Sequence, residues 1–279
     1  MQELLERLLQ SPALQALASN AGRSILLCLG FGVCMCILER AFGAQTRQYR
    51  AKTFAHDVVY WIVNGSGIFR IVGGVALLTL IHRSVPQAQL RPLEGLPEWI
   101  QYVILLLAFD FSSYWVHRWQ HASPLLWAFH STHHTQEELS FATTARSHPV
   151  EQWFLSLAVF LPVALLLGPQ PSVWLPVALA QQFLFAMTHS RLDWGFGPLQ
   201  RVLVSPSFHS THHSLRPEHH DRNFAAIFSF WDFLFGTATP TNRRVEACGL
   251  KQIGMPTFWS TLTVPFQMAF ATARTRRLH

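Results

Sequence analysis

The residues best suited to chemistry in this chain are histidines, which occur in three short blocks. Residues 129–134 read Phe-His-Ser-Thr-His-His, and residues 208–213 repeat the same six residues. Each copy spaces its imidazoles at i, i+3 and i+4, which places them on one face of a helix. A third block, His-Arg-Trp-Gln-His at 117–121, contains an i, i+4 pair. Imidazole is the most common metal ligand in proteins and suits iron, copper, zinc and nickel, so the pattern predicts a multi-histidine metal site.

The number of histidines favours two metal ions over one. The eight imidazoles of the three blocks exceed the four ligands of a tetrahedral structural site. The HExxH motif of zinc peptidases is absent from the sequence, and paired haem ligation does not require triplets at i, i+3 and i+4. Mostly neutral ligands around two redox-active metals, each with open coordination positions, favour activation of O2.

The composition indicates a membrane protein. Half of the 279 residues are apolar and 13% are charged, against about 25% in soluble domains. The net charge of +6 includes no run of Lys and Arg interleaved with aromatics, so a nucleic-acid partner is not expected. Basic residues beside membrane spans explain the excess better. The four cysteines contain no CxxC pair and are expected to be small buried apolar residues.

The apolar segments predict an all-α integral membrane protein with about four to five transmembrane helices. Spans are expected near 23–39, 55–82 and 98–116, followed by a helical hairpin over 150–188. The basic loop at 40–52 is placed in the cytoplasm by the positive-inside rule. All three histidine blocks then lie on the cytoplasmic side, where they form a histidine-rich helical cap. No basic segment precedes an apolar core at the N-terminus, so we expect no cleavable signal peptide.

Two Ser-Pro pairs predict where the helices that carry the repeated block begin. Ser123-Pro124 precedes the first copy and Ser205-Pro206 precedes the second. Serine is a favoured N-cap residue, and proline is favoured at the first helical position.

The three blocks resemble, in sequence and order, the histidine boxes of the fatty acid hydroxylase/sterol desaturase superfamily of integral-membrane di-iron oxygenases. Residues 110–115 resemble the family's lead-in to the first box. Residues 223–225 and 231–237 resemble its segment after the last box. The resemblance covers residues 100–240 or so, whereas the N-terminal third is similar to the family only in its hydropathy.

The resemblance implies two iron ions, O2 as the oxidant and electrons from a separate donor. One further family histidine is matched by His189, and the implied metal ligands are His117, His121, His130, His133, His134, His189, His209, His212 and His213. Some fatty acyl hydroxylases carry another histidine four residues after the one that His189 matches. Here that position is Asp193, which is expected to orient a ligand instead.

Carboxylates near the blocks are expected to accept the free imidazole N–H of a ligand and fix its tautomer, with a helix cap or an ion pair as the alternative. The candidates are Asp110, Asp193, Asp221 and Asp232. Further candidate ligands are His148, which lies between a histidine block and the hairpin, and His219 and His220, for which a flexible loop pair is the alternative. Two histidines far from the blocks are expected to be structural, namely His56 and His82.

These features predict an enzyme that hydroxylates a C–H bond of a lipid or sterol. A desaturase of the same family is the first alternative, because the box spacing does not distinguish the two reactions. A metal transporter is disfavoured, since its ligands usually lie within the spans near the bilayer midplane. A non-catalytic membrane di-metal scaffold is the remaining alternative. The sequence has no cytochrome b5-like domain, so a ferredoxin- or cytochrome b5-type donor is expected.

We therefore expect a multi-pass membrane protein with its active site facing the cytoplasm. Its expected regions are N-terminal membrane helices at 1–97, a fatty acid hydroxylase-like catalytic region at 98–245, and a basic C-terminal tail at 246–279.

Overall fold

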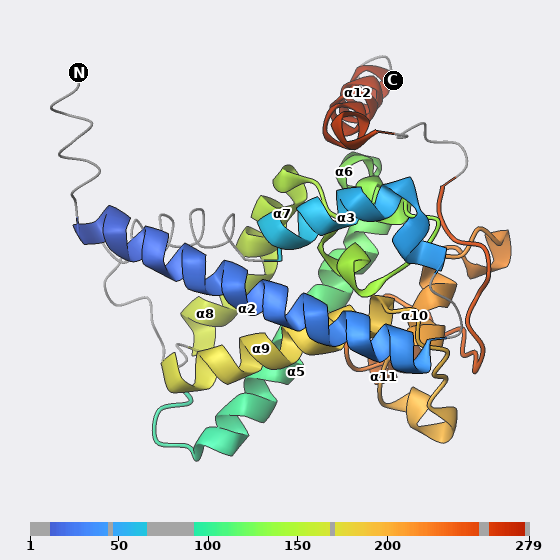
Figure 1. The fold of residues 1–279 in the computed structure, drawn as a ribbon. Helices are drawn as coiled ribbons and strands as arrows, with labels where there is room; N and C mark the ends of the chain where they lie inside the picture. The colour runs from blue at the N-terminus through green and yellow to red at the C-terminus, as the bar shows by residue number, and fades with distance from the viewer. Residues whose placement is uncertain (1–11, 44–46, 66–91, 168–170, 251–256, 277–279) are drawn as a thin grey trace, which may run out of the picture.

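The computed structural model describes residues 12–43, 47–65, 92–167, 171–250 and 257–276. Within these ranges the regular structure is helical, and the only β pairing is two isolated bridges. The predicted all-α class is therefore confirmed (Figure 1).

Two long helices of the described residues could cross a membrane by length and composition. In α2 (Pro12–Phe42) the stretch that qualifies is Ile25–Phe42, whereas α5 (Glu98–Ala122) qualifies as a whole by its length and mean hydropathy. Both match predicted spans. α3 (Lys52–Val63) covers the beginning of the predicted span at 55–82, whose remainder lies outside the described residues. The structure thus supports two spans and does not confirm the larger number predicted.

Two helical legs occur where the helical hairpin is predicted, between residues 149 and 189, and the connection between them at 168–170 lies outside the described residues. The first leg comprises α7 (Pro149–Leu155), a π-helical turn η3 (Ser156–Phe160) and α8 (Leu161–Leu167). The second leg is α9 (Pro171–His189), which ends on a predicted metal ligand. Whether the hairpin enters a membrane remains a prediction.

An apolar cluster holds the hairpin against α5. Val159 and Val163 of the first leg and Val177 of the second leg are buried together with Leu105 and Phe109 of α5. Close packing of these side chains holds the helices together by van der Waals contact, which acts in lipid as well as in water. The cluster therefore fixes α9 relative to α5, so that the C-terminal ends of both helices are held in place.

The two copies of the repeated block lie on short helices, α6 (Pro124–His134) and α10 (Pro206–His212). Both begin as predicted. The Ser123 hydroxyl accepts a hydrogen bond from the Leu126 N–H at 3.5 Å, and the Ser205 hydroxyl accepts one from the Phe208 N–H at 3.1 Å. In both cases proline follows at the first helical position.

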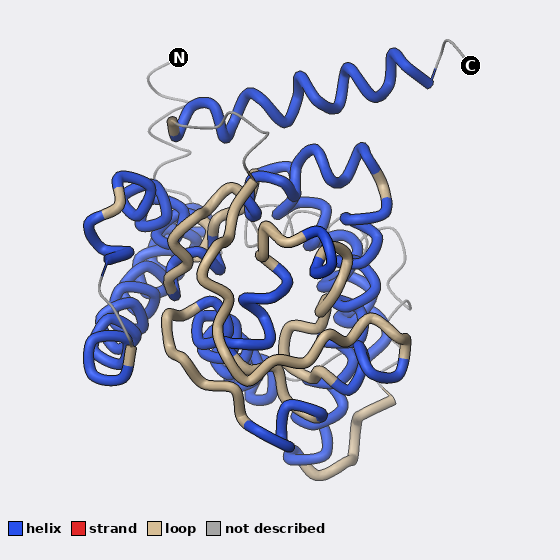
Figure 2. Tube along the Cα trace, turned by 90° about the vertical axis from the view of Figure 1, so that its right-hand side faces the viewer, coloured by secondary structure: helices blue, strands red, loops and turns tan. Residues whose placement is uncertain are grey.

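Short helices and loops make up most of the remaining described chain, and Figure 2 shows the side of the molecule on which many of them gather. The remaining helices are η1 (Arg47–Arg50), η2 (Phe141–Ala145), η4 (Gly197–Arg201), η5 (Pro217–His219), α11 (Phe230–Leu234) and α12 (Phe258–Arg276). α12 packs on α6, where the Thr132 hydroxyl donates to the Thr261 carbonyl at 3.2 Å.

The two N-caps give a matched test of how the box helices are held. Replacing Ser205 with alanine should lower the free energy of unfolding by about 1 kcal/mol, because the Phe208 N–H loses its acceptor in a fully buried position. Ser123→Ala should cost less, because its hydrogen bond is longer and the residue is only partly buried. Thermal unfolding in detergent checks both variants, and equal shifts in melting temperature would contradict the assignment.

Candidate metal centre

The nine predicted ligands meet at one buried centre, where they form two groups. In each group, one ring nitrogen from every histidine lies within 4.8 Å of the others. The five-histidine group consists of His117, His121, His130, His134 and His212. The four-histidine group consists of His133, His189, His209 and His213.

Helical spacing divides each copy of the repeated block between the two groups. In α6 the i, i+4 pair His130 and His134 joins the five-histidine group, while His133 joins the other. In the second copy the division is reversed. His209 and His213 join the four-histidine group, and His212 joins the five-histidine group. The groups are therefore adjacent, and each copy contributes to both.

The Nε2 atoms of these rings face one another at short distances. They are 2.9 Å apart between His189 and His209, and 3.1 Å apart between His133 and His189. Nitrogens bound to one metal at bond lengths of about 2.0–2.1 Å lie about 3 Å apart, so these separations suit a shared cation.

Three further Nε2 atoms, those of His117, His121 and His212, are buried without a protein hydrogen-bond partner. A buried polar atom without a partner is costly, and a metal ion would satisfy all three. The donor set therefore fits two metal ions.

Hydrogen bonds on the opposite side of four rings fix the tautomer. Each Nδ1 donates to a backbone carbonyl, and the pairs are His117 with Phe224 at 2.8 Å, His133 with Arg146 at 3.1 Å, His189 with Phe185 at 2.9 Å, and His212 with Arg222 at 2.7 Å. A carbonyl oxygen can only accept, so the proton is assigned to Nδ1. The Nε2 lone pair is then free to bind a metal.

Two rings of the five-histidine group have a carboxylate as the Nδ1 partner. His121 lies 3.2 Å from Asp221, which agrees with the role expected for that aspartate. His130 lies 2.6 Å from Glu151, whose side chain is almost fully buried. The sequence analysis missed Glu151. Its signal was an acidic residue at the start of an otherwise apolar segment, where a buried carboxylate needs a partner.

The other expected carboxylates contact the backbone and not an imidazole. Asp110 accepts from the N–H groups of Ile227 and Phe228, at 2.9 and 2.8 Å. Asp232 accepts from the Phe224 and Ala225 N–H groups, at 2.8 and 2.9 Å. The irregular chain between α10 and α11 has buried N–H groups that need acceptors, and these two carboxylates supply them.

The expected direct contact with a ligand ring is therefore not observed for Asp110 or Asp232. It is not observed for Asp193 either, which accepts from the Arg244 N–H at 3.1 Å. Asp232 still acts on the site through the backbone, because the carbonyl of the Phe224 residue that it holds accepts from His117.

Burial keeps the imidazoles neutral. It lowers the pKa of His134 and of His213 well below the usual value, and the neighbouring imidazoles lower both further. A neutral imidazole is the form that binds a metal ion.

The secondary histidines lie outside both groups. His148 caps α7, with Nδ1 accepting from the Val150 N–H at 3.1 Å and Nε2 donating to the Leu262 carbonyl at 3.1 Å. His219 lies in η5, and His220 follows it in an exposed position. His56 contacts the Phe258 ring, and His82 is outside the described residues.

Comparison with known proteins finds relatives for the region that holds the site. The alkylglycerol monooxygenase of Danio rerio is 35% identical over 158 residues, which are 56% of this chain and 34% of that protein. The ornithine lipid hydroxylase OlsE of Rhizobium tropici is 32% identical over 50% of this chain and 42% of its own length. Methylsterol monooxygenase 1-3 of Arabidopsis thaliana is 31% identical over 52% of this chain and 50% of its own.

The chain thus spans between a third and a half of the length of these relatives. No solved structure matches it. The model of the fatty acid hydroxylase family matches residues 102–237, which include all nine histidines of the two groups. Residues 102–237 therefore match a fatty acid hydroxylase domain, and the chain is similar to that family through this region.

Proposed function

We propose that the nine histidines hold two iron ions and that the chain is an O2-dependent oxygenase that hydroxylates a membrane lipid or sterol. The observation that carries this proposal is the paired set of neutral imidazoles, whose Nε2 atoms face inward while outward hydrogen bonds hold Nδ1 of most rings. Nitrogen ligands in this number, with no cysteine among them, suit a redox-active metal better than a closed structural zinc site.

The relatives support a lipid substrate and an oxygen-inserting reaction. Their names specify an alkylglycerol, an ornithine lipid and a methylsterol, each acted on by a monooxygenase or a hydroxylase. These names favour hydroxylation over desaturation for this chain too.

The candidate spans support a substrate that reaches the metal site from the bilayer. α5 exposes apolar side chains that include Val103, Phe111 and Trp115, and it leads directly into His117. Apolar surface of this kind suits contact with lipid, and tryptophan suits the membrane interface. We infer that the site sits at the membrane surface on the cytoplasmic side of a multi-pass protein.

Bound iron would supply reduction of O2 and oxidation of the C–H bond, with electrons from a separate ferredoxin- or cytochrome b5-type donor. The chain's own residues set the conditions for that chemistry. The nine histidines act as ligands, the carbonyls and carboxylates behind them fix six of the rings, and burial of the centre excludes water. The catalytic region at 98–245 and its flanking membrane and tail regions remain our proposed division of the chain.

One prediction concerns the metal itself. His133→Ala and His212→Ala remove a ligand from the four- and five-histidine groups respectively, so each should lower bound iron and abolish turnover. His220→Ala is the matched control, because this exposed histidine belongs to neither group. The iron content of the three variants is measured by plasma mass spectrometry. Equal iron content in all three would contradict the assignment of His133 and His212 as metal ligands.

Glu151 gives a second prediction. Glu151→Ala removes the buried acceptor of the His130 N–H, so the five-histidine group should bind its metal about 10–100-fold more weakly. Glu246→Ala, at an exposed acidic residue, should leave the affinity unchanged. Both are measured by titrating the metal-free protein with Fe(II). An unchanged affinity for Fe(II) in Glu151→Ala would show that the glutamate does not support metal binding.

The reaction is tested by lipid analysis of cells that express the chain under 18O2, with the His133→Ala variant as control. A lipid that gains one labelled oxygen only with the active chain is the expected result. Loss of two hydrogens without label would reassign the chain as a desaturase. No change, with iron bound and a donor present, would favour the scaffold.

A further inference from the structure

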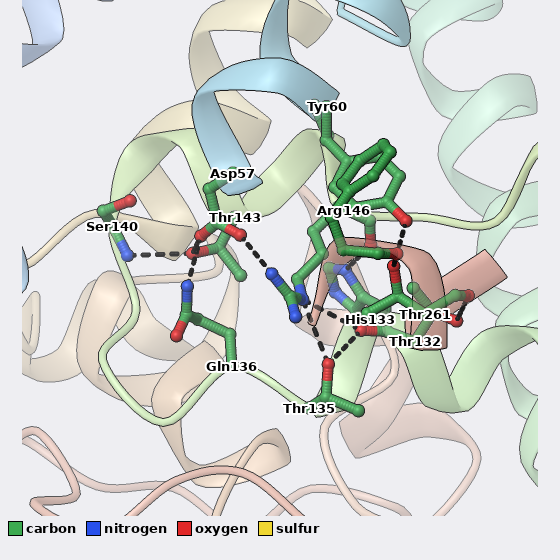
Figure 3. Close-up of polar contacts among 12 residues, drawn as sticks. Asp57, Tyr60, Thr132, His133, Thr135, Gln136, Ser140, Thr143, Arg146 and Thr261 are labelled. Carbon is green, nitrogen blue, oxygen red and sulfur yellow. Dashed lines mark hydrogen bonds and ion pairs between the residues drawn. The ribbon is translucent and has the colours of Figure 1, made fainter. Parts of the chain in front are cut away.

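A buried ion pair between Asp57 and Arg146 lies beside His133, a member of the four-histidine group (Figure 3). The Arg146 guanidinium contacts the Asp57 carboxylate at 2.8 Å, and both side chains are excluded from solvent. Charges in such a position are expensive to bury, so a pair of this kind is weak evidence for stability by itself. Its contacts point to another role.

Arg146 holds the end of α6 on both sides of His133. Its backbone carbonyl accepts the His133 Nδ1–H at 3.1 Å. Its Nε donates to the Thr132 carbonyl at 3.2 Å and to the Thr135 hydroxyl at 3.0 Å. One residue therefore fixes the orientation of the ring and also the backbone immediately before it.

Asp57 holds the loop from which Arg146 projects. Its second carboxylate oxygen accepts from the Gln136 amide at 2.6 Å and from the Thr143 hydroxyl at 2.8 Å. All three side chains are fully buried. Asp57 thereby joins both ends of the chain from 136 to 146, and Figure 3 shows these contacts converging from α3.

The two histidine groups depend on different supports. The five-histidine group has two carboxylates in contact with its rings, at His121 and His130. Within the four-histidine group the Nδ1 acceptors are the carbonyls of Arg146 and Phe185, while the Nδ1 atoms of His209 and His213 are buried without a hydrogen-bond partner. The hydrogen bond from His133 Nδ1 to the Arg146 carbonyl is thus one of two Nδ1 hydrogen bonds that orient rings of the four-histidine group.

Asp57 also lies outside the region that matches the family. It belongs to α3, which ends at Val63, whereas the match begins at residue 102. Asp57 is therefore one of the residues through which the N-terminal part of the chain contacts the support of the metal centre.

We propose that Asp57 and Arg146 are positioning residues for His133 and thereby set the metal affinity of the four-histidine group. This inference rests on the proposed metal site but not on the reaction, because metal binding is measured without substrate. We expect a smaller effect on the five-histidine group, because the pair contacts none of that group's rings although it also holds the end of α6.

The test is titration of the metal-free full-length chain with Co(II), with stoichiometry measured by plasma mass spectrometry. Arg146→Lys keeps a positive charge for Asp57 but loses the planar fork that reaches Thr132 and Thr135. We expect it to bind one ion nearly as the unaltered chain does and the second about 10–100-fold more weakly. Asp57→Asn should give the same pattern through loss of the charge that holds Arg146.

Two additions make the outcome specific. When His189→Ala is added to Arg146→Lys, the amount of cobalt bound at limiting metal should fall little further, because the four-histidine group already binds weakly. When His117→Ala is added instead, the affinity for the remaining ion should fall, because His117 belongs to the five-histidine group. Gln200→Ala is the control, because Gln200 is a buried polar residue whose amide donates to the Gly195 and Thr241 carbonyls, neither of which belongs to the chain from 136 to 146. It should lower the melting temperature and leave both affinities unchanged.

Equal weakening of both ions in Arg146→Lys, or unchanged binding of both, would overturn the positioning role. If the unaltered chain binds no cobalt or iron, the proposed metal site fails instead. If it binds two ions but oxidises no lipid, the proposed reaction fails and the positioning role stands.

Discussion

The constraint on which the structure depends is the burial of nine imidazoles with their Nε2 atoms facing one another. Acceptor nitrogens at 2.9–3.3 Å have no protein group between them to satisfy their lone pairs. Such an arrangement is unfavourable without a cation and favourable with one, because each metal ion replaces several unmet hydrogen bonds at once. The surrounding fold therefore has to hold the rings together before any metal arrives. Outward hydrogen bonds on Nδ1 do this for six of the rings.

The helices follow from that requirement. α5 and α9 are long apolar elements whose C-terminal ends carry His121 and His189, and the buried cluster between them sets the distance between those ends. α6 and α10 are short, so each relies on a serine cap and on neighbouring elements to keep its direction. The i, i+3, i+4 spacing then sends neighbouring rings of one helix to different groups. Two adjacent groups arise from two copies of one motif without a further element.

The parts of the site that could be predicted from the sequence are those that follow from the spacing of residues along one helix. The histidine blocks and the Ser-Pro starts of their helices carry local signals, and the structure has both. The supports behind the rings carry no such signal. A carbonyl acceptor such as that of Phe224 can belong to any residue type, so its position follows only from the folded chain. Asp110 and Asp232 were expected beside imidazoles, but the buried N–H groups of a neighbouring loop are closer to them.

The long-range contacts that support the rings could not be predicted from the sequence either, because the two partners of each contact are far apart along the chain. Glu151 contacts a ring 21 positions earlier, and Asp57 contacts Arg146 across 89 positions. In each case a carboxylate stands in an apolar segment, where the cost of burying its charge demands a partner that spacing alone does not identify. An isolated charge in an apolar segment therefore indicates that its helix contacts a buried polar centre. In this chain such charges connect α3, which lies outside the family match, to the same centre as α6 and α7. The buried polar contacts around the centre therefore extend beyond the segment that matches the family.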